Sequence, residues 1–115
     1  MFRRAFLITL ILVLPTLLFG QSQFVGKWQN KRGRITGSVV VETDRIGGMV
    51  IFADFRGNLE MPISNARQTG KTLAFETKDR DDTFYWRLTL YRKTRGRLEG
   101  RMREMLFDER VKKRH

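Results

Sequence analysis

Apolar and polar residues alternate with a period of two along most of the chain after residue 22. The alternation is clearest over residues 83–92, which read TFYWRLTLYR. One set of positions carries Phe84, Trp86, Leu88 and Leu90, and the other set carries Tyr85, Arg87, Thr89 and Tyr91. A strand sorts such residues onto two faces, whereas a helix would scatter them around its circumference. The pattern therefore predicts a β-strand with one buried and one exposed face.

Further segments show the same alternation or are rich in β-branched residues, and short turns separate them. Phe24, Gly26 and Trp28 would share one face of the first strand. Pro62 lacks an N–H group, which places its segment at a sheet edge or a bulge. The glycine pair in residues 44–48 predicts a tight hairpin turn there. The strands predicted up to residue 92 are 24–30, 35–43, 49–55, 59–63, 72–77 and 83–92.

The tail after residue 97 has two interpretations. As strands, residues 98–106 and 109–114 would pair around Phe107 and Asp108. As a helix, Met102, Met105 and Leu106 would share one face, and the terminal cations would suit the helix C-terminus. We favour strands, because the preceding alternation is so regular.

Seven or eight short strands with short turns predict an all-β domain over residues 23–115. The chain has no cysteine, so disulfides cannot stabilise this small domain. Closing the sheet would remove its exposed edges. We therefore expect a single antiparallel up-and-down β-barrel.

Residues 1–22 have the composition of a secretory signal peptide. Arg3 and Arg4 precede an apolar run over residues 5–19, and Gly20 and Ser22 are small residues suited to cleavage after Ser22. The alternative is an uncleaved membrane anchor through residues 5–20. A helix of about 16 residues spans roughly 24 Å, short of a hydrocarbon core of about 30 Å, and Pro15 interrupts it. We expect an exported protein, periplasmic or secreted.

The net charge is +11, and the part after residue 22 keeps 21 Lys and Arg against 12 Asp and Glu, a net charge of +9. The positive charge therefore belongs to the folded domain. An exported basic domain meets anionic membrane surfaces and acidic envelope glycans, and no nucleic acid is expected as its partner. Three basic stretches, at 31–34, 92–97 and 111–114, would lie close together if their turns gather at one end of the barrel.

The step Gly26-Lys27-Trp28, followed by a succession of hairpins, resembles the first strand of the lipocalin and avidin-like calycin barrels. The resemblance implies that Trp28 closes one barrel end and that Gly26 lets the strand bend there. It also implies that an Arg or Lys from the last strands packs across the Trp28 ring, with Arg101 and Arg103 as the main candidates and Arg110 as a less favoured one. A cup for a small ligand, lined by Phe75, Phe84 and Trp86, would follow from such a barrel.

Catalytic chemistry has little support in the sequence. The single histidine is the last residue, His115, and no Gly-rich phosphate loop or metal-ligand spacing is present. No catalytic residue, cofactor or metal site is predicted. We expect a non-enzymatic binding module for a small or polymeric ligand, anionic ligands included. The alternatives are an accessory module that docks an anionic partner or membrane through its basic face and, least favoured, a carboxylate-dependent hydrolase.

Overall fold

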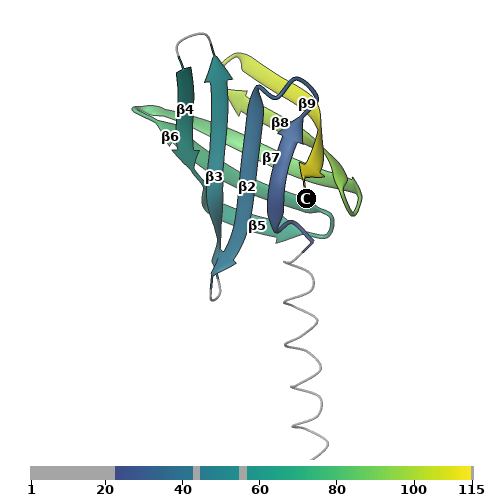
Figure 1. Cartoon of the computed structure of the whole chain (residues 1–115). Helices are drawn as coiled ribbons and strands as arrows, with labels where there is room; N and C mark the ends of the chain where they lie inside the picture. Colours follow the sequence, from purple (N-terminus) through teal and green to yellow (C-terminus); the bar gives the residue numbers. More distant parts are fainter. Residues whose placement is uncertain (1–22, 43–44, 55–56, 115) are drawn as a thin grey trace, which may run out of the picture.

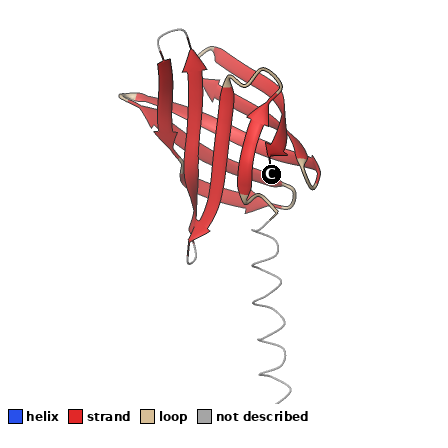
Figure 2. Ribbon diagram, viewed as in Figure 1, coloured by secondary structure: helices blue, strands red, loops and turns tan. Residues whose placement is uncertain are grey.

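A computed structural model describes residues 23–42, 45–54 and 57–114, and the predicted signal segment 1–22 lies outside them. The described residues form strands and turns and contain no helix, so none there is long and apolar enough to cross a membrane (Figure 2). The tail is therefore a pair of strands. The strands are β1 (Gly26–Asn30), β2 (Ile35–Glu42), β3 (Arg45–Asp54), β4 (Gly57–Pro62), β5 (Ser64–Thr69), β6 (Thr72–Asp79), β7 (Asp82–Arg92), β8 (Arg95–Met102) and β9 (Met105–Arg114).

The strands form one antiparallel sheet in the order β4-β3-β2-β1-β9-β8-β7-β6-β5. Figure 1 shows this sheet folded over, with β1 to β4 in front and β5 to β9 behind. The pairing of β1 with β9 joins the two layers along one side. Neighbours in sequence are neighbours in the sheet, as expected for an up-and-down arrangement, except at β4 and β5.

The prediction of a closed barrel is wrong, because the sheet has two ends, β4 and β5. Pro62 closes β4 and cannot donate a ladder hydrogen bond, and only Ile63 separates the two strands. A single linking residue cannot build a hairpin, so the chain turns a corner. The Ile63 N–H donates to the Gly48 carbonyl oxygen (2.9 Å) and holds this corner against β3.

The two glycines predicted for a turn lie within β3, where Gly47 pairs with Val40 and Gly48 with Val39. Gly48 has a φ of +145°, and a Cβ at this position would lie 1.8 Å from the Ser38 carbonyl oxygen. Glycine is therefore required here for close approach of two strands and not for a hairpin.

The tail differs from the prediction in the position of its turn. β8 ends at Met102 and β9 begins at Met105, so Arg103 and Glu104 form the turn and Phe107 lies within β9. One strand, β5, was not predicted, because its sequence SNARQT has almost no apolar residue. Its sequence has no strand pattern of its own, and pairing with β6 stabilises its extended conformation.

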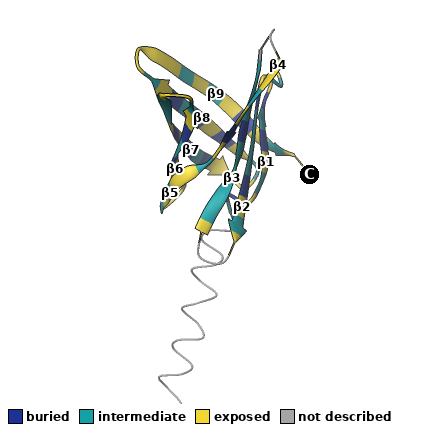
Figure 3. Ribbon diagram, turned by 90° about the vertical axis from the view of Figure 1, so that its left-hand side faces the viewer, coloured by how far each residue is buried: buried dark blue, intermediate teal, exposed yellow. Residues whose placement is uncertain are grey.

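The space between the layers holds one core of buried side chains, drawn in dark blue in Figure 3. Its members are the inward residues that the alternation predicts on β1, β6 and β7, together with partners from the other strands. The buried apolar residues are Phe24, Trp28, Ile35, Val39, Val50, Met61, Leu73, Phe75, Trp86, Leu88, Leu90, Leu98 and Val111.

Replacing Leu88 by alanine is expected to lower the free energy of unfolding by about 2–5 kcal/mol, because it opens a cavity in this core. The neighbouring Thr89 faces outward, and its hydroxyl lies 3.3 Å from that of Thr72. Thr89→Ala should therefore change the free energy by no more than about 1 kcal/mol. Denaturant unfolding of the two variants measures both values. Equal losses would contradict the assignment of the two faces of β7.

Candidate anion-binding groove

The three aromatic residues predicted to line a ligand cup pack on one another inside the fold. The Trp86 ring stacks on Phe84 and Phe75, with ring centroids 5.8 and 6.4 Å apart. The Trp86 indole N–H donates to the Thr77 hydroxyl oxygen (2.8 Å). Phe75 and Trp86 are buried, so their surfaces are already occupied by core contacts. Their role in ligand binding stays a prediction, and the outer surface is the better place to seek a site.

Trp28 is buried where β1 meets β9, and its indole N–H donates to the Phe24 carbonyl oxygen (2.9 Å). The Lys113 ammonium lies over the indole, with Nζ 5.0 Å from the ring centroid. Gly26, at a φ of +143°, leaves room for the Lys113 methylene groups, which lie within 3.2 Å of where its Cβ would stand. The cation over Trp28 is therefore Lys113 of the last strand.

The two main candidates for the partner of Trp28 lie elsewhere. Arg101 is exposed on β8, opposite Tyr85 on one side and Leu106 on the other. Arg103 lies in the β8–β9 turn, and its Nη2 forms an ion pair with Asp82 Oδ1 at 2.8 Å. Lys113 was not predicted, because the turn of the tail was expected at Phe107 and Asp108. With the turn misplaced, nothing in the sequence indicated that Lys113 pairs with Trp28.

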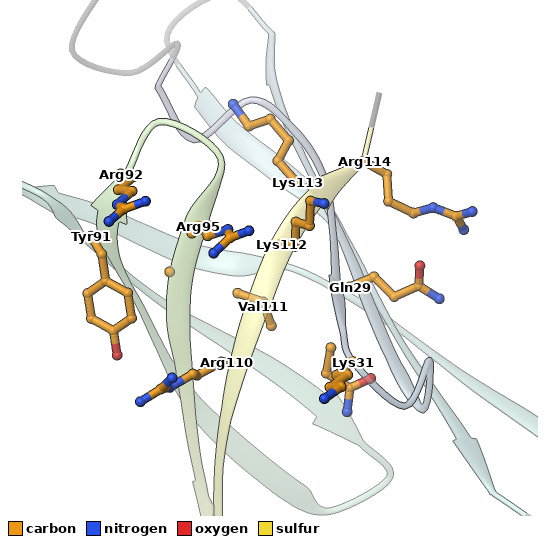
Figure 4. A pocket seen from close by; sticks show the side chains of 12 residues that line it. Gln29, Lys31, Tyr91, Arg92, Arg95, Arg110, Val111, Lys112, Lys113 and Arg114 are labelled. Carbon is orange, nitrogen blue, oxygen red and sulfur yellow. The ribbon is translucent and has the colours of Figure 1, made fainter.

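A surface groove of about 740 Å³ runs along β9, between β1 and the β7–β8 turn (Figure 4). Side chains from four strands contribute to it, and Arg95 and Lys112 lie side by side at its centre. No carboxylate is among the lining residues, which are Gln29, Asn30, Lys31, Tyr91, Arg92, Arg95, Gly96, Arg110, Val111, Lys112, Lys113 and Arg114. Cations from each of the three basic stretches therefore line one groove.

Strand register places like charges opposite one another on this outer face. Lys112 stands opposite Arg95, Arg110 opposite Arg97, and Arg114 opposite Lys27. Like charges in facing positions of a sheet destabilise it. The arrangement therefore produces a positive potential that a bound anion would relieve.

Two carboxylates interrupt the cations further along the same face, and each is paired. Asp108 accepts hydrogen bonds from Arg97, including one of 2.6 Å from Nε, and these bonds lower the pKa of the Asp108 carboxyl. Glu99 forms an ion pair with Arg87 at 3.7 Å. Among the described residues, no carboxylate lies within ion-pairing distance of Arg92, Arg95, Arg110 or Lys112. These groove cations are therefore available to a ligand.

A second pocket, of about 570 Å³, continues the basic surface past the β7–β8 turn. It shares Tyr91, Arg92 and Lys113 with the groove and adds Lys71 and Lys93. Partial burial lowers the pKa of Lys113, whose Nζ donates to the Gln23 carbonyl oxygen at 3.1 Å. Lys113 thus lines both pockets and also holds Gln23 in place through this hydrogen bond.

Within the ranges that the structure describes, no group of three or more His, Cys, Asp or Glu side chains is placed to hold a metal ion. The chemistry that the groove offers is charge and hydrogen-bond donation, from guanidinium and ammonium groups.

Comparisons of the chain with protein-family models, with curated proteins and with solved structures each gave no match.

Proposed function

We propose that this chain is a non-enzymatic, exported binding module that holds a polyanionic ligand in the groove along β9. The observation that carries the proposal is a groove of about 740 Å³ lined by cations from β7, β8, β9 and the turn after β1, with no carboxylate among its lining residues. Export rests on the composition of residues 1–22, where a basic start precedes an apolar run.

The groove suits a polymer better than a single small anion. Arg110, Lys112 and Arg114 alternate along β9 and so stand roughly 7 Å apart. Arg95 and Arg92 extend the row sideways across the β7–β8 hairpin. An arginine fork can bind two oxygens of one phosphate, sulfate or carboxylate group. A ligand with repeated anionic groups would therefore engage several of these side chains at once.

A distant relation to the calycin barrels belongs to the same proposal. Its support is the up-and-down strand order, the pairing of β1 with β9, and the lysine of the last strand over Trp28. The open corner between β4 and β5 is where the chain departs from that architecture.

The double variant Arg95→Glu, Lys112→Glu is expected to weaken binding of inorganic polyphosphate by about tenfold or more, because it reverses two facing charges at the groove centre. Calorimetric titration of the full chain, in micelles of an uncharged detergent, measures the affinity. Raising the salt concentration should weaken the binding of the unaltered chain, because screening reduces the attraction.

The matched control is Arg67→Glu, Lys78→Glu. Both residues are exposed, on β5 and β6, and outside the groove lining, and the change in net charge is the same. This variant should lose no more than about threefold in affinity. Equal losses in the two double variants would mean that net charge alone attracts polyphosphate, and the groove would lose its assignment.

A further inference from the structure

We propose that the polyanion recognised by this chain is the headgroup layer of an anionic phospholipid bilayer, on which the outer surface of β7, β8 and β9 lies. This surface, the β7–β9 face, comprises the outward side chains of those strands, including the groove cations. The inference rests on the proposed function, since it names the partner of the same groove.

The first observation is that the β7–β9 face gathers exposed apolar and aromatic side chains beside its cations. Leu106, near the start of β9, is 80% exposed and lies opposite the exposed Arg101. Tyr85 and Tyr91 on β7 are 58% and 53% exposed. Tyrosine is favoured at the boundary between lipid and water, where its ring is in apolar surroundings and its hydroxyl stays wet. A soluble polyanion would leave the Leu106 side chain in water.

The second observation is the order of side chains across the face. Register places Tyr85, Arg101 and Leu106 in one row over three neighbouring strands. The groove cations occupy the opposite end of the same strands, at the β7–β8 turn. The paired groups Arg97 with Asp108 and Arg87 with Glu99 lie between and add no net charge. The face therefore combines headgroup-binding cations with side chains that can enter the lipid boundary.

The third observation is where the chain enters the fold. Gln23 is held at the basic end, since its side-chain amide donates to the Gly70 carbonyl oxygen (3.1 Å) and its own carbonyl oxygen accepts from Lys113. Phe24 is fully buried beside it. Gln23 also lines the second basic pocket, together with Lys71 and Lys93. The start of the described chain therefore lies at the cationic surface.

The short connection between the apolar run 5–19 and Gln23 keeps this surface near any membrane into which that run inserts. Phe19 lies four residues before Gln23 in the sequence, and an extended chain of that length reaches no further than about 14 Å. The attraction of cations to an anionic leaflet acts within a Debye length, roughly 8 Å at physiological ionic strength. The basic end is thus kept close to the range where lipid headgroups act on it, both during export and for a retained anchor.

The test uses fluorescent labels on single cysteines, which are unique because the chain has none of its own. One variant is Leu106→Cys on the β7–β9 face. Its matched control is Val40→Cys, an exposed apolar position on β2 in the other layer (Figure 1). Full chain carrying an environment-sensitive dye is mixed with vesicles of phosphatidylcholine alone or with about one-third phosphatidylglycerol.

The Leu106 label should brighten about twofold and shift to shorter wavelength with the anionic vesicles only. The Val40 label should stay unchanged with both kinds of vesicle. Arg95→Glu with Lys112→Glu should abolish the response at position 106. A response at position 106 that is the same with neutral vesicles, or that is matched at position 40, would overturn the inference, because insertion of residues 1–22 alone would explain it.

Inorganic polyphosphate, titrated into the same full chain, separates the two proposals. Binding of polyphosphate without a response to anionic vesicles would overturn the bilayer as partner and would leave a soluble polyanion, such as an envelope glycan, in the groove. Failure of both probes would overturn the groove function together with the inference built on it.

Discussion

Replacing Trp86 by alanine is expected to lower the free energy of unfolding by about 3–5 kcal/mol, the range typical of a large aromatic residue removed from a core. The ring contacts Phe75, Phe84 and Phe107, with centroid distances of 5.8 to 6.4 Å. It also fills the space above Gly100, where an added Cβ would lie 2.4 Å from the indole. A glycine cannot extend into the cavity, so the gap would stay open.

The matched control for this variant is Tyr85→Ala, the neighbouring aromatic residue on β7, which faces outward. Its loss should stay within about 1 kcal/mol, because it removes no core contact. A third variant, Trp86→Phe, keeps part of the ring and removes the hydrogen bond to the fully buried Thr77 hydroxyl, so its loss should lie between the other two. Chemical denaturation measures all three. A loss at Tyr85 as large as at Trp86 would contradict the placement of the core.

Replacing Trp28 by alanine should also lower the free energy of unfolding by about 3–5 kcal/mol, since the ring is buried and its N–H is bonded to the Phe24 carbonyl oxygen. The specific test is the contact with Lys113. In a double-mutant cycle of Trp28→Phe and Lys113→Met, we expect a coupling free energy of about 0.5–2 kcal/mol. A cation–ring contact is stronger where it is shielded from water, so the partial burial of Lys113 favours the upper part of this range.

Arg101 provides the matched control for the cycle, because it lies on the exposed side of β8 and forms no described contact with Trp28. Trp28→Phe with Arg101→Met should therefore be additive, within about 0.3–0.5 kcal/mol. Coupling to Arg101 in place of Lys113 would mean that the register of β9 against β1 is wrong. Additivity in both cycles would leave Trp28 as an ordinary core residue.

Local alternation was sufficient to predict most strands and the faces of β7. Phe84, Trp86, Leu88 and Leu90 are four inward positions in a row, and no helix could bury them together. The turns after Asn30 and Thr69 were also predictable, because glycine and polar residues gather there. The segment SNARQT has no such pattern, so β5 could be found only from its pairing with β6.

Contacts between distant segments could not be predicted in the same way. The glycine pair at Gly47 and Gly48 has the composition of a hairpin turn, but Gly48 serves the close approach of Ser38 across the sheet. The sheet stays open between β4 and β5, where Ile63 is the single linking residue and Pro62 has no N–H to donate. In each case the local sequence is compatible with two structures, and a partner far along the chain selects one.

The sequence by itself determined the all-β class, most of the strands with their buried faces, and the excess of positive charge, because these depend on residue type and on a period of two. Only the tertiary structure decided that Lys113, and neither Arg101 nor Arg103, lies over Trp28. It also decided that Lys31, Arg92 and Lys112 line one groove. The physical reason is that strand register is a long-range property. A shift of one residue in the pairing of β9 would turn every one of its side chains to the other face.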